Sequence, residues 1–319
     1  MSYYLYKLQF TTPLHVGESR LANGLESAQL NICADTLFSA ICHSIIGIEG
    51  EGALNAFVDK VRANNILFSD TFPYKQDKLY IPKPYITSKS NREIDISKRK
   101  LMKKLSYIPV ETINTFLNSV AGKDIFDPET ITNDFCLNTV DTKVNLTEGP
   151  YSVASVSFFE GCGLYGIVKG EKPDIEYIIN HLKMLGLSGI GGKISSGYGK
   201  FKVIDVINLE EEVNSQYGLL LSLLKNTNSD YYISLTTSLP TDSELERAIE
   251  GAAYKMVRRG GFMYSTKLNR PLKKQTQYCF YAGSVFRTRY EGDVYNVATK
   301  DAPHPAYRYL KPIFLGVNI

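Results

Sequence analysis

The chain has 319 residues, of which 44% are apolar and 22% charged; this composition is typical of globular proteins and excludes a disordered or fibrous one. Its length predicts one large domain or two of ordinary size, and two are favoured. The 36 basic and 33 acidic residues leave a net charge of only +3, so the placement of charge is more informative than its sum.

The first residues contain no basic segment followed by an apolar block, and no stretch reaches the roughly 18 apolar residues that a membrane helix needs. We therefore expect a cytoplasmic protein that makes no contact with a membrane. The five cysteines are odd in number and never closer than nine residues apart: Cys33, Cys42, Cys136, Cys162 and Cys279. This spacing predicts neither a disulfide framework nor a CxxC metal site, and we expect no cofactor and no bound metal.

Periodicity predicts the elements of the first half in chain order. Residues 3–10 alternate as a half-buried strand, and Asp35 is placed to cap a helix that ends near Gly47 to Gly50. A second helix is predicted at about 51–64. Residues 82–148 are polar, rich in lysine and punctuated by prolines, which indicates an insertion that projects from the domain. Further predicted elements are strands at 151–159 and 164–168, a helix that opens at Pro173, and a strand at 200–207.

The second half repeats this order. Its predicted elements are a strand at 231–237, a helix at about 242–251, and strands at 254–259, 278–286 and about 313–317. Two successive units of strand, helix, strand and strand predict an α+β protein with two tandem ferredoxin-like (RRM-like) domains. The N-terminal domain is assigned to residues 1–210, with the thumb insertion at 82–148 and a glycine-rich loop at 186–200. The C-terminal domain is assigned to residues 211–319.

Positive charge is concentrated in two segments. Residues 251–290 contain nine basic and no acidic residues, and residues 83–104 contain eight basic and two acidic ones. Such segments on an otherwise acidic chain indicate a surface that binds a polyanion, although solvated loops with solubilising lysines are the plainer alternative. In 251–290 the arginines alternate with aromatic residues, a combination that suits unpaired bases.

The glycine-rich loop is the most specific local feature. It has six glycines in the fourteen positions from 186 to 199, and its amides could form a cradle for phosphate. A nucleotide P-loop and a dinucleotide GxGxxG motif both fail on spacing, and the loop follows a predicted helix instead of a strand. The plainer alternative is a long turn that lets the helix and the next strand pack closely.

The sequence resembles the RAMP superfamily of CRISPR RNA-binding proteins, and within it most closely the fourth Csm subunit of type III-A interference complexes. The resemblance rests on segments that occur in order along nearly the whole chain: 14–17 (LHVG), 34–40 (ADTLFSA), 191–199 (GGKISSGYG), 254–262 (YKMVRRGGF), 282–286 (AGSVF) and 304–309 (HPAYRY). The glycine loop indicates the superfamily, whereas the C-terminal segments narrow the match to this subunit.

The resemblance implies a subunit without catalysis of its own that grips the 5′ handle of the CRISPR guide RNA. It also implies docking on the large polymerase-like Csm subunit and on the neighbouring backbone Csm subunit. The glycine amides and Lys193 would meet phosphates, Tyr198 would offer a stacking face, and the arginines and lysines of 251–290 would add charge. The full set of expected RNA contacts is His15, Gly17, Arg20, Gly191, Gly192, Lys193, Ser195, Ser196, Gly197, Tyr198, Arg258, Arg259, Lys273, Lys274 and Ser284.

Two enzymatic alternatives stay open. His15, in the loop after the first strand, could be the acid or base of a metal-independent endoribonuclease that processes precursor CRISPR RNA. A small-molecule enzyme could use the glycine loop for a nucleotide. Asp35 is interpreted as a helix cap and not as a metal ligand, His43 and His181 as local structural groups, and His304 as a residue that fixes a loop.

Overall fold

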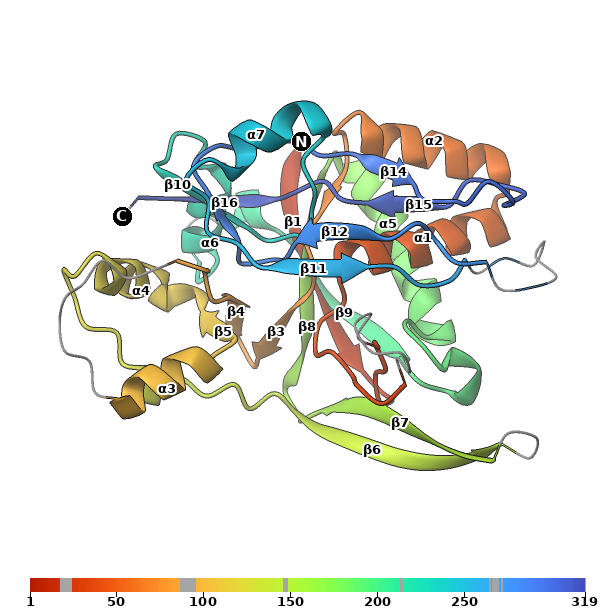
Figure 1. The fold of residues 1–319 in the computed structure, drawn as a ribbon, viewed down its shortest axis with the longest axis horizontal. Helices are drawn as coiled ribbons and strands as arrows, with labels where there is room; N and C mark the ends of the chain where they lie inside the picture. Colours follow the sequence, from red (N-terminus) through yellow and green to blue (C-terminus); the bar gives the residue numbers. More distant parts are fainter. Residues whose placement is uncertain are drawn as a thin grey trace.

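The computed structural model describes residues 1–17, 25–86, 96–145, 149–212, 215–263, 265, 270 and 272–318 (Figure 1). Arg20 lies outside these residues. In the part of the chain so described, no helix has the length and apolar character that a membrane span requires.

The first half is built on an antiparallel sheet in which β1 (Ser2–Phe10) lies next to the edge strand. The strand β1 lies between β8 (Cys162–Gly170) and β9 (Phe201–Asn208), and the order along the sheet is β5-β4-β3-β8-β1-β9. The remaining strands are β2 (Leu67–Phe68), which also pairs with β8, β3 (Phe72–Lys75), β4 (Lys78–Pro82) and β5 (Tyr107–Pro109). The predicted alternation of β1 is confirmed, because successive side chains enter the cores on its two faces.

Three helices cover one face of this sheet: α1 (Ala34–Ile48), α2 (Glu51–Arg62) and α5 (Lys172–Ser188). All three were predicted from helical spacing, and Pro173 lies in the first turn of α5 as expected. The cap of α1 was predicted wrongly. Cys33 is the N-cap residue, and the Asp35 side chain points to an ion-pair partner from the second half of the chain.

The second half forms smaller sheets. The strands β10 (Tyr231–Ser234), β13 (Val285–Phe286) and β16 (Phe314–Val317) make one sheet, and β11 (Met256–Arg259) pairs with β12 (Gln277–Phe280) in another. The strand predicted at 278–286 is therefore two strands, interrupted at Gly283, which has a positive φ of 93°. A hairpin of β14 (Val294–Asn296) and β15 (Tyr307–Tyr309) and the helices α6 (Gly218–Lys225) and α7 (Asp242–Ile249) complete this half.

Part of the segment 82–148 belongs to the core, contrary to our reading of it as a projecting insertion. The helix α4 (Ile113–Val120) buries Ile113, Phe116 and Leu117 in the cluster that also contains α6 and the second face of the first sheet. Its apolar residues recur at helical spacing, a signal that the abundance of lysine and proline around it obscured. The segment also contains α3 (Ile96–Lys104). What does project is the ribbon of β6 (Cys136–Asn145) and β7 (Gly149–Phe158) (Figure 1).

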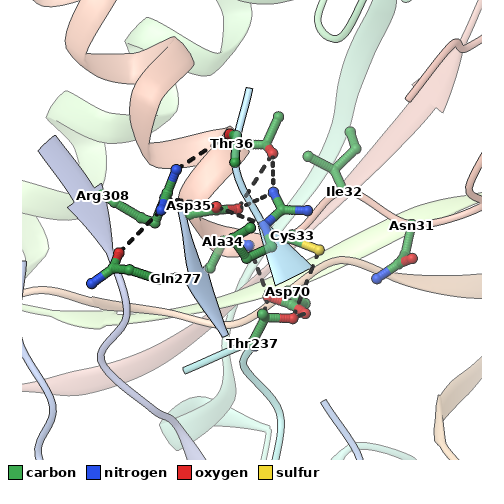
Figure 2. A network of polar contacts seen from close by, with 12 residues as sticks. Asn31, Ile32, Cys33, Ala34, Asp35, Thr36, Asp70, Thr237, Gln277 and Arg308 are labelled. Atoms are coloured by element: carbon green, nitrogen blue, oxygen red, sulfur yellow. Dashed lines mark hydrogen bonds and ion pairs between the residues drawn. The ribbon is translucent and has the colours of Figure 1, made fainter. Parts of the chain in front are cut away.

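A buried carboxylate joins the two halves of the molecule. The oxygen Oδ1 of Asp70 accepts hydrogen bonds from the backbone N–H groups of Ala34 (2.8 Å) and Thr237 (3.0 Å), and Oδ2 accepts from the Thr237 hydroxyl (2.6 Å) (Figure 2). These bonds link the start of α1 to the segment that follows β10. Burial raises the pKa of Asp70 to about 6, even though the hydrogen bonds from Thr237 and Ala34 lower it.

This pKa predicts a pH dependence of stability. A raised pKa means that the folded state holds the proton of Asp70 more tightly than the unfolded state does, so stability increases as the pH falls from about 6 towards 3.8. Relative to Asp70→Asn, the free energy of unfolding of the wild type should rise by about 3 kcal/mol across this window. Urea denaturation of both proteins at several pH values measures the difference. A constant difference across the window would contradict the assignment.

Candidate nucleic-acid interface

The glycine-rich loop lies between the C-terminus of α5 and the start of β9. Its backbone has positive φ at Gly189, Gly191, Gly197 and Gly199, and also at Lys193 (φ 60°), a non-glycine residue in the left-handed region. The loop is fastened to the segment after β1, because the N–H of Gly192 donates to the carbonyl of His15 (2.8 Å). The N–H of Gly199 donates likewise to Pro13 (2.8 Å). These bonds fix the loop as a rigid wall instead of a free flap.

A cleft of about 940 Å³ opens along this wall, and we call it the loop cleft. Its other walls are α1, the end of β11 with Gly260, and residues 274 and 307–308. The loop cleft brings together seven of the predicted RNA contacts: Gly17, Gly191, Gly192, Lys193, Ser195, Arg259 and Lys274. Residues that are far apart in the sequence thus face one volume.

Arg259 is held in a buried ion pair. Its Nε donates to Oδ2 of Asp35 (2.9 Å) and its Nη2 to Oδ1 (2.5 Å), and only 12% of the side chain is exposed. Nη2 also donates to the Thr36 hydroxyl (3.0 Å). The guanidinium of Arg308 lies 3.9 Å from the same carboxylate, and Figure 2 shows Arg308 between Asp35 and Gln277. We predicted Arg259 as a charge offered to RNA. The structure shows instead that its charge is satisfied by Asp35 and ties β11 to α1.

Lys274 lines the loop cleft and has no ion-pair partner in the part of the chain that the structure describes. Within the described residues, no carboxylate lies within ion-pair distance of its ammonium, although the side chain is half-buried in the cleft wall. Burial lowers the pKa of Lys274, and Arg308 and Arg259 lower it further, whereas Asp35 raises it. An anion bound in the loop cleft would raise the pKa of Lys274 again by stabilising its charged form. The site is therefore suited to a phosphate group.

Lys193 connects the loop to the projecting ribbon. Its ammonium lies over the ring of Tyr151 on β7, 4.3 Å from the ring centroid. The N–H groups of Gly191 and Lys193 donate to no group in the described part of the chain. By contrast, the N–H of Gly192 is used by His15, and that of Gly197 donates to Ile194 (2.9 Å). The prediction that all the glycine amides meet phosphates is therefore wrong for Gly192 and Gly197.

Three further predicted contacts are turned inward. Tyr198 is only 8% exposed and cannot offer a ring face for stacking. The hydroxyl of Ser284 is fully buried and donates to the carbonyl of Tyr281 (2.6 Å). His15 is 3% exposed, with Nδ1 2.6 Å from the carbonyl oxygen of Ala154. Each of these residues is the most polar or the most aromatic one in its short segment. The sequence of the segment does not show that the residue faces the interior.

The remaining predicted contacts are exposed, or partly exposed in the case of Gly197, but do not line the loop cleft. They are Ser196 and Gly197 in the loop, Arg258 on β11, and Lys273 next to Lys274. Among the residues that line it and were not predicted as contacts are His43, Phe262 and Arg308. Burial lowers the pKa of His43, and Lys274 lowers it further. Among the described residues, no cluster of three or more His, Cys, Asp or Glu side chains could hold a metal ion.

The other two histidines have structural partners. His181 lies between Glu49 (2.9 Å) and Ser44 (2.8 Å), where it links α5 to α1. His304 lies 2.8 Å from the Ser265 hydroxyl and 2.8 Å from the carbonyl of Pro305, which confirms that it fixes a loop.

Because the glycine-rich loop packs closely against His15, a methyl group added at Gly191 should lower the stability of the protein. A Cβ added at Gly191 would lie 2.4 Å from the carbonyl oxygen of His15, and φ is +95° there. We expect Gly191→Ala to lower the free energy of unfolding by about 2 kcal/mol or more. The control is Gly52→Ala in α2, where the added Cβ meets nothing within 4 Å and should stabilise the helix by about 0.5–1 kcal/mol. Thermal denaturation compares the two, and equal effects would contradict the close packing of the loop.

Comparison with known proteins places this geometry in a family. A family model described as the CRISPR Csm4 C-terminal domain matches residues 227–317. The chain is 31% identical over 301 residues to the CRISPR system protein Csm4 of Mycobacterium tuberculosis, covering 92% of this chain and 93% of the relative. It is 31% identical over 327 residues to Csm4 of Streptococcus thermophilus, with both chains covered completely.

Solved structures share the fold over the whole length. A crystal structure of a Csm3–Csm4 subcomplex of the type III-A CRISPR-Cas interference complex aligns with a TM-score of 0.63 and 18% identity, covering 100% of both chains. A Csm1–Csm4 cassette in complex with cA4 aligns with a TM-score of 0.62 and 20% identity, covering 99% of this chain and 98% of the other. The mixed helix and antiparallel-sheet architecture of this chain is thus the one found in these structures.

Proposed function

This chain belongs to the Csm4 family of Csm-complex subunits, and from that premise we propose that it is an RNA-binding subunit that grips the 5′ handle of the CRISPR guide RNA. The observation that carries the proposal is the loop cleft. It combines an unpartnered, half-buried lysine with a rigid glycine-rich wall that offers unused backbone N–H groups. These are the donors that position a sugar–phosphate chain.

The charges of the loop cleft favour a polyanion over a neutral ligand. Asp35 neutralises one guanidinium, but Arg308, Lys274 and Lys193 leave the cleft with an excess of positive charge. An RNA strand delivers phosphates at regular spacing along such a wall, and its bases can turn away from it. The exposed Phe262 at the rim of the cleft supplies an aromatic face for one of those bases.

We propose two ferredoxin-like domains, with the boundary near residue 210, and a thumb inserted in the first. In the described part of the chain, each sheet takes its strands from one side of this boundary. In the first half, four strands lie in the order β3-β8-β1-β9, and α1 and α5 cover one face of them. This is the arrangement of a ferredoxin-like fold. The projecting ribbon of β6 and β7 forms the tip of the thumb, where it can kink the guide as handle becomes spacer (Figure 1).

The proposed partners follow from the relatives. A Csm4 protein has been crystallised with Csm3 and another with Csm1. We propose that this chain likewise docks on the backbone subunit and on the large polymerase-like subunit, and so joins the guide RNA to both.

We further propose that the chain has no catalysis of its own. An endoribonuclease based on His15 needs that imidazole to reach the RNA, but the ring is buried under the glycine loop and bonded to Ala154. Incubating the pure protein with precursor repeat RNA should leave the RNA intact. Specific cleavage that is lost in His15→Ala would overturn this part of the proposal.

A binding titration at several salt concentrations tests the RNA-binding function itself. The full chain should bind a single-stranded RNA that carries the repeat-derived 5′ handle, and the affinity should fall steeply with salt. A duplex of the same sequence should bind more weakly, because bases that are paired with a second strand cannot turn away from the cleft wall. Binding that is absent, or independent of salt, would refute the proposal.

A further inference from the structure

A second cleft, of about 540 Å³, lies between the segment 82–148 and the C-terminal half; we call it the insertion cleft. It is lined by residues 28–31 ahead of α1, by the end of α3, by β5 and the start of β6, and by β11. The basic segment 83–104, which the sequence indicated as a polyanion-binding surface, supplies three of its lysines. We propose that the insertion cleft recognises one unpaired nucleobase of the RNA whose backbone lies in the loop cleft, an inference that rests on the function proposed above.

The charge of the insertion cleft suits RNA. Four lysines line it, Lys83, Lys103, Lys104 and Lys255, and among the described residues of its lining none is acidic. Lys103 and Lys104 are exposed, and Lys255 lies over the ring of Tyr281, 5.4 Å from its centroid. An anion entering this cleft therefore meets cations that no carboxylate of the lining neutralises.

Two amide side chains supply what a base edge needs. The oxygen Oε1 of Gln29 is buried, and no group in the described part of the chain donates to it. Asn31 is 3% exposed, and its Oδ1 accepts from the Tyr281 hydroxyl (3.1 Å), which fixes the amide beside that ring. Buried polar groups are normally paired, so the unused acceptor of Gln29 points to a missing ligand that carries a donor.

The aromatic lining completes a site for a base. Tyr107, Tyr281 and Phe135 line the same cleft as Gln29 and Asn31. Unpaired bases are bound by stacking on such rings together with hydrogen bonds to the base edge, and a matched donor and acceptor pair is what an Asn or Gln side chain presents to a base. The ligand is therefore a nucleobase with a hydrogen-bond donor and an acceptor on one edge.

The strand β11 joins the two clefts. Lys255, just before β11, and Val257 line the insertion cleft, whereas Arg259 at the end of β11 and Gly260 after it line the loop cleft. At the rise of a strand, Lys255 and Arg259 are about 13 Å apart. One RNA strand laid along β11 would thus place its backbone at Lys274 and a base at Gln29. The loop cleft would supply affinity for any sequence, and the insertion cleft would supply sequence preference.

The test compares the binding of oligo-A, oligo-C and oligo-U RNA to the full chain. The wild type should prefer one of them by about fivefold or more. Gln29→Met should reduce this preference to less than about twofold without lowering the thermal stability, because it removes a buried acceptor that has no partner among the described residues. The control Gln9→Met changes an exposed amide on β1 that lines neither cleft and should keep the preference.

A second variant separates this inference from the proposed function. Lys104→Met, at the exposed end of α3, should weaken binding of all three RNAs and reduce its salt dependence. A wild type without preference, a Gln29→Met protein that keeps its preference, or a Lys104→Met protein that binds normally would each overturn the role of the insertion cleft. If Lys274→Met still weakened binding in those cases, the RNA-binding function would stand. A chain that binds none of the RNAs would overturn both.

Discussion

We expect Asp35→Ala to lower the free energy of unfolding by about 3–5 kcal/mol, because it leaves two buried guanidinium groups without their carboxylate. Arg259 forms two hydrogen bonds to the Asp35 carboxylate, and Arg308, whose side chain is 4% exposed, lies 3.9 Å from it. Without the carboxylate, both guanidinium groups would face each other and Lys274 in a wall that water enters poorly. The loss should also loosen the contact between α1 and β11, since the pair joins residues 224 positions apart.

The control for this variant is Asp59→Ala on α2. Asp59 also lies near an arginine, Arg62, but at 4.0 Å and with 76% of its side chain exposed, so its loss should cost less than about 1 kcal/mol. The double variant Asp35→Ala/Arg259→Met should recover part of the lost stability, which a double-mutant cycle measures by urea denaturation. If Asp35→Ala and Asp59→Ala were equally mild, the buried pair would not be the link between the two halves.

The same pair predicts a loss of stability in acid. Burial alone would raise the pKa of Asp35, but Arg259 outweighs it, with help from Arg308 and Lys274, so the pKa lies below its ordinary value. A lowered pKa contributes stability above the unfolded value of 3.8, and this contribution is lost as the pH falls through the folded value. The Asp35→Ala variant lacks this contribution, so its stability should depend less on pH in that range.

The second large effect concerns RNA affinity. We expect Lys274→Met to weaken binding of handle RNA about tenfold, because one charge-assisted contact to a phosphate is lost. The slope of log affinity against log salt should fall in magnitude by about 0.7, the value for one contact to a single strand. Because burial, Arg308 and Arg259 lower the pKa of Lys274, the wild type should also lose affinity at a lower alkaline pH than an ordinary lysine site would.

The adjacent residue is the matched control. Lys273 is exposed and does not line the loop cleft, so Lys273→Met removes the same charge from the same segment and should change affinity less than about twofold. Equal losses in the two variants would mean that RNA responds to the general charge of residues 251–290 and not to the loop cleft. Both variants should fold normally, because neither lysine has an ion-pair partner among the described residues.

The sequence predicted those elements whose periodicity is local. The strand β1 and the helices α1, α2 and α5 were found because their apolar faces repeat without interruption. The helix α4 was missed because its four apolar positions lie within a lysine-rich segment. The second half was predicted less well, since its strands are two to four residues long and Gly283 divides one of them.

Several residues that line the loop cleft were predicted from the sequence, but their contacts were not. Glycine density marked the loop, and basic residues marked β11 and its surroundings, so their meeting in one cleft could be anticipated. The pairing of Arg259 with Asp35 and the inward orientation of Tyr198 and Ser284 depend on contacts between distant segments, which one sequence does not encode locally. The insertion cleft was missed for the same reason, because Gln29, Tyr107 and Lys255 come from three separate segments.

Ultraviolet crosslinking of the full chain to handle RNA, followed by mass spectrometry of the crosslinked peptides, tests the central claim most directly. The account predicts crosslinks within 188–195 and at Arg259, Gly260, Phe262 or Lys274, which line the loop cleft, beside those that the insertion cleft gives. It also predicts that Lys274→Met reduces their yield more than Lys273→Met does. Crosslinks confined to other surfaces, such as α7 or the outer edge of β9, would contradict it.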